Sequence, residues 1–133
     1  MKRQFKSLLD LAALGPSGLE RPPDDCLRRL DDEREELLRA ETDVNRAEEA
    51  GDMAYYAAIA WHNNALTLEK AKGVVQDAAR VAGLTTQQVF EVARVKYRLR
   101  FVVYQCDKTR SHEAEWNAIS ALLDKWGDRH SGR

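Results

Sequence analysis

The spacing of apolar residues constrains the fold of this chain more than any other feature. Between residues 30 and 47 they recur every three or four positions, which places them on one face of an α-helix. The residues of this face are Leu30, Leu37, Ala40, Val44 and Ala47. The sequence has no long β-branched runs that alternate with a period of two, so a sheet is not expected. We therefore predict an all-α fold.

Length and composition agree with this prediction. The chain has 133 residues, of which 44% are apolar and 32% are charged, with only 7 Gly and 3 Pro. A chain of this size can bury a modest core as one domain. We predict a single all-α domain over residues 1–133, a helical bundle of about five helices that oligomerisation would complete.

Glycine, proline and capping residues indicate where the helices begin and end. The expected helices are 2–14, 24–50, 52–82, 86–106 and 111–126. The first belongs to an N-terminal segment, 1–19, and the middle three form a helical core, 24–106. Gly51 either breaks the chain or permits a close helix contact. The tail, 127–133, is expected to be disordered.

Four carboxylates lie on the helix faces that should be buried. They are Glu33, Glu36, Glu49 and Asp52. Ionised carboxylates against a core are unfavourable unless they are paired, and four that face one another would repel or take up protons. A divalent cation such as Mg²⁺ prefers carboxylate oxygens and would remove this repulsion. The pattern therefore predicts a metal site.

A solvated acidic face is the alternative explanation. Residues 20–52 contain thirteen Asp or Glu and six Arg, so pairs of acids at helical spacing arise there by chance. Many such acids only form i,i+4 pairs, as Arg29 and Glu33 would. The second pair, Glu49 with Asp52, favours the metal site. Residues 80–133 are net basic, and an acidic centre beside a basic region suits a cation together with a polyphosphate.

The order of these acids resembles the MazG-like all-α nucleotide pyrophosphohydrolases. Asp32-Glu33-x-x-Glu36 is followed by twelve residues and then by Glu49-x-x-Asp52, and the match covers about residues 28–72. Downstream, the sequence from Lys96 to Phe101 is similar to the closing helix of that family. Two departures are Ala93, where the family usually has Asn, and the longer distance from Asp52 to the Gly-Leu-Thr turn at Gly83.

The resemblance implies an activity and a set of site residues. The activity is cleavage of a (d)NTP, a nucleoside triphosphate, to (d)NMP and pyrophosphate. Glu33, Glu36, Glu49 and Asp52 would be the catalytic metal ligands for Mg²⁺, with Mn²⁺ as a substitute. Lys96 and Arg100 would neutralise the polyphosphate. The family also implies a homodimer or homotetramer with sites at subunit contacts.

Two further residues are candidates for substrate binding. Asn63 lies on the same helical stripe as Asp52 and would hydrogen-bond the substrate. Tyr56 would stack on a base, although aromatic residues at helical spacing are more often part of a core.

Two other functions remain open from the sequence. Residues 75–100 match the spacing of a helix-turn-helix, with Gly83 at the turn and Arg94, Lys96, Arg98 and Arg100 on the helix that follows, so DNA binding is one alternative. A catalytically degenerate helical protein that only binds nucleotides or a partner is the other.

The two cysteines, Cys26 and Cys106, lie far apart, and no signal peptide or membrane-spanning segment is recognisable. We therefore expect free thiols, a cytoplasmic location and no membrane contact.

Overall fold

The computed structural model describes residues 1–131 and confirms the all-α prediction. It contains six α-helices and one π-helical turn, and no strand occurs within residues 1–131. The elements are α1 (Lys2–Ala12), α2 (Pro23–Arg39), α3 (Asp43–His62), α4 (Leu68–Ala82), α5 (Thr86–Arg98), the π-helix η1 (Leu99–Val103) and α6 (Lys108–Ser131). Among the described residues, no helix combines the length and apolar character that crossing a bilayer requires.

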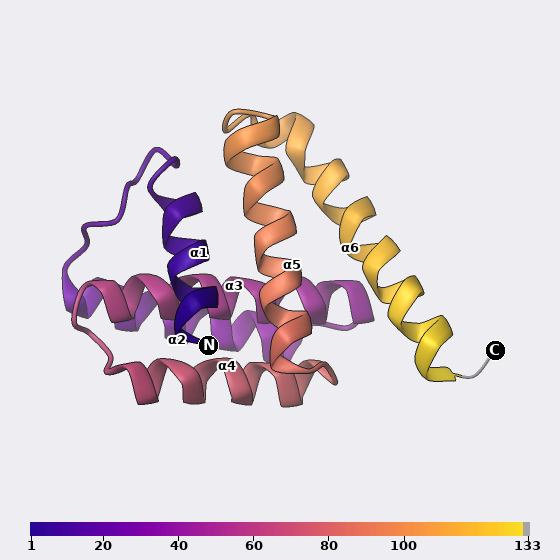
Figure 1. Cartoon of the computed structure of the whole chain (residues 1–133), viewed down its shortest axis with the longest axis horizontal. Coiled ribbons are helices and arrows are strands. Elements are labelled where there is room, and N and C mark those ends of the chain that lie inside the picture. Colours follow the sequence, from indigo (N-terminus) through magenta and orange to yellow (C-terminus); the bar gives the residue numbers. More distant parts are fainter. Residues whose placement is uncertain (132–133) are drawn as a thin grey trace.

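Helix α3 is the centre of the bundle. Helices α1, α2, α4, α5 and α6 all contact it. In Figure 1, α2, α3 and α4 run roughly parallel to one another, whereas α1 and α5 cross them. The buried side chains of α3 include six alanines: Ala47, Ala50, Ala54, Ala57, Ala58 and Ala60. These small side chains allow neighbouring helices to approach α3 from several sides.

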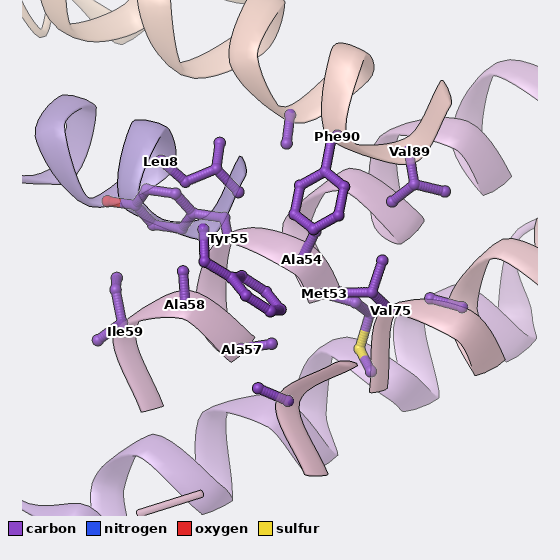
Figure 2. Packing of buried hydrophobic residues seen from close by; sticks show 14 of the residues in the cluster. Leu8, Met53, Ala54, Tyr55, Ala57, Ala58, Ile59, Val75, Val89 and Phe90 are labelled. Atoms are coloured by element: carbon purple, nitrogen blue, oxygen red, sulfur yellow. The ribbon is translucent and has the colours of Figure 1, made fainter. Parts of the chain in front are cut away.

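The core lies where these helices meet. Figure 2 shows Leu8 of α1, Met53 of α3, Val75 of α4 and Phe90 of α5 directed into one cluster. The ring of Phe90 also meets the ring of Phe5 edge-on, with 5.2 Å between the ring centres. A smaller cluster attaches α6 to α3 and α5; its buried members are Ala47, Val92, Ile119 and Trp126. Both cysteines are free, and Cys26 is buried in the main core.

The expected helix over 24–50 is wrong, because the chain turns sharply between α2 and α3. Ala40 has an extended backbone with ψ of 132°, which ends α2. The Thr42 hydroxyl then accepts a hydrogen bond from the Asn45 backbone N–H at 3.1 Å and caps α3. Arg46 donates to the Ala40 carbonyl at 3.3 Å across the turn. The four acids are thereby divided, with Glu33 and Glu36 on α2 and Glu49 and Asp52 on α3.

The other boundaries differ for similar reasons. The expected helix over 52–82 is interrupted after His62, where Asn64 takes a positive φ of 59° and Thr67 caps α4 through the Lys70 N–H. The first helix ends at Ala12 rather than at 14, and α5 passes into the π-helix before Cys106. Helix α6 starts at Lys108 and continues to Ser131, so residues 127–131 are helical rather than a disordered tail. Residues 132–133 lie outside the described part of the chain.

Gly51 lies inside α3 at a close contact with α5. A Cβ atom at this position would come within 3.0 Å of Val92 Cγ1 and 3.2 Å of the Ala93 backbone nitrogen. The second interpretation of Gly51, a close helix contact, is therefore confirmed. Ala93 occupies the facing position, so α3 and α5 approach each other through two of the smallest side chains.

Substitution of Gly51 tests this contact. Alanine normally stabilises a helix interior by about 0.5–1 kcal/mol relative to glycine. Gly73 of α4 has nothing within 4 Å of a new Cβ, so Gly73→Ala should obtain this gain. Gly51→Ala should be less stable than Gly73→Ala by at least about 1 kcal/mol, because the backbone of α5 cannot move aside without repacking. Urea unfolding measures both, and equal gains would contradict the close contact.

Candidate metal centre

The turn between α2 and α3 brings three glutamates together at the seam between these helices. Glu33, Glu36 and Glu49 each offer one carboxylate oxygen, and these oxygens all lie within 4.8 Å of one another. Glu33 is 2% exposed, Glu49 is half-buried and Glu36 is exposed. Carboxylate oxygens in such a group are the ligands that hard divalent cations prefer. We call Glu33, Glu36 and Glu49 the acid cluster.

Two oxygens of the acid cluster are buried without a hydrogen-bond partner among the described residues. They are Glu33 Oε2 and Glu49 Oε2. The other oxygen of Glu33 forms an ion pair with Arg29 Nε at 3.1 Å. A buried acceptor without a donor is uncommon and unfavourable, so each such group calls for an explanation. Either a cation at this place or a proton on Glu49, donated in a hydrogen bond to Glu33, would supply a partner within the cluster.

Burial and mutual repulsion raise the pKa of two of these carboxyls. Burial is the largest cause for Glu33, followed by the charges of Asp52 and Glu36, and its pKa rises to about 7. Burial is also the largest cause for Glu49, again followed by the charge of Asp52, and its pKa rises to about 9. In the absence of a cation, Glu49 therefore holds a proton at neutral pH.

Asp52, the fourth predicted ligand, is held by helix α5. Lys96 Nζ donates to both Asp52 oxygens, at 2.8 and 3.0 Å, and the Tyr97 hydroxyl donates to Oδ1 at 2.8 Å. Lys96 also lies 3.4 Å from Glu48 Oε2. Burial by itself would lower the pKa of Lys96, but the charges of Asp52 and Glu48 raise it, so the ammonium stays charged. Lys96, a predicted polyphosphate-binding residue, thus pairs with Asp52, a predicted metal ligand.

Arg100 is paired as well. Its Nη2 donates to Glu115 Oε1 at 2.7 Å and its Nε donates to Glu115 Oε2 at 3.3 Å. Glu115, a residue of α6, is fully buried. The guanidinium is therefore fixed by the C-terminal helix.

The two remaining predicted residues have different surroundings. The Asn63 side chain accepts from the Arg21 backbone N–H at 3.0 Å and donates to the Leu19 carbonyl at 2.8 Å. It thereby attaches the loop after α1 to the end of α3. The Tyr56 ring lies under the guanidinium of Arg29, 4.7 Å from the ring centre. Arg29 consequently joins Tyr56 to Glu33.

The residues that sequence reasoning missed are the partners of the charged groups. Tyr97 and Glu48 complete the surroundings of Asp52 and Lys96, and Glu115 completes those of Arg100. Tyr97 directly follows Lys96, but nothing in the sequence pairs it with a residue 45 positions earlier. Glu115 lies 15 residues after Arg100 on the next helix, and no local signal in the sequence pairs the two.

The proposed helix-turn-helix segment forms two helices, α4 and α5, joined through Gly83 in a left-handed conformation with φ of 71°. Of the four basic residues on α5 and η1, Lys96 and Arg100 are paired inside the protein, and Arg94 and Arg98 are directed outward. Two of the cations expected for a DNA backbone thus have intramolecular partners.

Comparison with known proteins adds no relative: the chain matches no family model, no curated protein and no solved structure. The function is therefore inferred from the geometry of the acid cluster and from the acidic motif over residues 32–52.

Proposed function

We propose that the protein is a Mg²⁺-dependent nucleotide pyrophosphohydrolase that cleaves a (d)NTP to (d)NMP and pyrophosphate. The observation that carries this proposal is the acid cluster, in which three carboxylate oxygens lie within 4.8 Å of one another and two buried oxygens have no donor among the described residues. The motif that resembles the MazG-like enzymes supplies these same residues. Asp52, which lies outside the acid cluster and accepts from Lys96 and Tyr97, would be the fourth ligand.

Neighbouring side chains would hold the metal ligands in position for this reaction. A bound Mg²⁺ would polarise phosphate oxygens and lower the pKa of a water nucleophile. Lys96 and Tyr97 fix the orientation of Asp52, and Arg29 restrains Glu33 from the other side. Such contacts orient metal ligands. The resemblance implies that Lys96, which is buried and paired with Asp52 and Glu48, would also offset the negative charge of a polyphosphate.

A nucleotide-binding protein without hydrolytic activity is a second candidate. The observation that favours it is the pairing of both predicted polyphosphate-binding cations, Lys96 with Asp52 and Arg100 with Glu115. The two candidates share the acid cluster and differ in whether a bound nucleotide is cleaved.

The proposal includes the setting that the motif implies. The enzyme would act in the cytoplasm, where both cysteines remain thiols, and would form a homodimer or homotetramer. Exposed apolar side chains near the junction of η1 and α6 support an assembled form: Val102 is 42% exposed, Val103 55% and Trp116 37%.

A single assay tests the proposed activity. Purified protein is incubated with pooled (d)NTPs, and pyrophosphate release is measured with Mg²⁺, with Mn²⁺ and with a chelator. We expect release with either metal and none with the chelator. Nucleotide binding without any pyrophosphate would support the second candidate and overturn the first.

A further inference from the structure

A small cavity with a positively charged wall lies beside the acid cluster. It has a volume of about 110 Å³ and lies between the loop after α1, helices α3 and α5, and the start of α6. The residues that line it include Arg21, Tyr56, Tyr97, Arg100 and Lys108. Its lining contains three cationic side chains and no carboxylate. A concave site lined by cationic side chains attracts an anion.

Two of the three cations of this wall, Arg100 and Arg21, are restrained by the fold, and Lys108 is exposed. Arg100 is fixed by its two hydrogen bonds to buried Glu115, which use two of the five N–H groups of the guanidinium. The backbone of Arg21 is held by Asn63, and its guanidinium lies 5.6 Å from the centre of the Tyr56 ring. A preorganised guanidinium loses little freedom when it binds a planar or tetrahedral oxyanion.

Two tyrosines of the cavity wall connect it to residues of the predicted metal site. Tyr97 lines the cavity and donates its hydroxyl to Asp52 at 2.8 Å. Tyr56 also lines the cavity, and Arg29, which covers its ring, pairs with Glu33. The cavity is therefore connected to Asp52 by one contact, through Tyr97, and to Glu33 by two, through Tyr56 and Arg29.

We propose that this cavity binds a phosphoryl group, with Arg21, Arg100 and Lys108 as its binding residues. The inference rests on the proposed function, in which the group belongs either to pyrophosphate or to the nucleoside monophosphate. The two sources share the same chemistry, a dianionic phosphate that accepts charge-assisted hydrogen bonds.

Titration calorimetry in the presence of a chelator tests the proposal. Removing divalent cations prevents phosphate from binding through a metal at the acid cluster, so any binding reports on cationic side chains. The probes are inorganic pyrophosphate in one arm and pooled nucleoside monophosphates in the other, and the arm with tighter binding identifies the source. We expect Arg21→Gln combined with Lys108→Gln to raise the Kd at least about tenfold, because each lost charge-assisted hydrogen bond is substantial.

The matched control is Lys125→Gln, an exposed lysine of α6 that does not line the cavity. It should bind as the parent protein does. Lys108→Gln alone, at an exposed position, gives a smaller loss and serves if the double variant does not fold. Failure of the parent protein to bind either probe at about 1 mM, or unchanged binding in the folded variants, would overturn the proposal. Lost binding in the variants without any hydrolysis by the parent would overturn only the proposed function.

Discussion

Replacement of Glu36 by glutamine is expected to reduce Mg²⁺-dependent pyrophosphate release by at least about a hundredfold, the scale set by losing a metal ligand rather than one of its supports. Glu36 contributes an oxygen to the acid cluster, and its side chain is otherwise exposed. The fold should therefore remain intact, with helicity and unfolding temperature close to those of the parent. The affinity for Mg²⁺, measured by calorimetry, should fall together with the activity.

Glu35→Gln is the matched control for this variant. Glu35 is the preceding residue on α2, is exposed and pairs only weakly with Arg39, at 3.4 Å. It should retain full activity and metal affinity, since exposed pairs of this kind contribute little. Full activity in Glu36→Gln would show that the acid cluster does not hold the catalytic ion.

In the absence of a divalent cation, the free energy of unfolding should fall as the pH rises from about 4.5 to about 9. The ordinary pKa of both Glu33 and Glu49 is 4.5, and in the folded protein these values rise to about 7 and about 9. Between the unfolded and the folded pKa, the folded protein holds protons that the unfolded chain has released. Stability therefore decreases with pH across this window, and above it the full loss of a few kcal/mol remains.

Mg²⁺ should reverse this trend. The cation binds the ionised carboxylates, so its stabilisation should be small near pH 5 and large near pH 9. Thermal unfolding with Mg²⁺ and with a chelator measures the difference. Glu49→Gln mimics the protonated carboxyl, and in the presence of the chelator it should flatten the pH profile. A parent protein whose stability is independent of Mg²⁺ at alkaline pH would contradict the site.

The helical faces could be predicted from sequence because they follow from local periodicity. Glu33 falls between Leu30 and Leu37 on one stripe, and this spacing determined its burial at the seam of α2 and α3. Thr67 and Thr85 are also local signals, because each caps the helix that follows it. The expected helix over 86–106 agrees with the Thr85 cap, whereas the expected helix over 52–82 runs through the Thr67 cap. The end of α2 at Ala40 does not follow from the periodicity, because the apolar stripe continues across it. The Thr42 cap is the local signal of this end, and the expected helix over 24–50 runs through it.

The charged partners could not be predicted in this way. The resemblance to the MazG-like enzymes implies a shared role of Lys96 and Arg100 toward a polyphosphate. Their partners, Asp52 and Glu115, are 44 residues before one and 15 residues after the other. Such pairings depend on how the helices cross, and helical periodicity contains no information about crossing.

Lys96 has a further consequence for how a cation would enter and leave. It neutralises Asp52 from within the protein, so the attachment of α5 to α3 does not depend on any bound ion. Once Glu49 is ionised, above its pKa of about 9, repulsion among the carboxylates acts instead between α2 and α3. The α2–α3 hairpin should accordingly open locally while the rest of the bundle stays closed. This local opening would give an incoming ion its route without global unfolding.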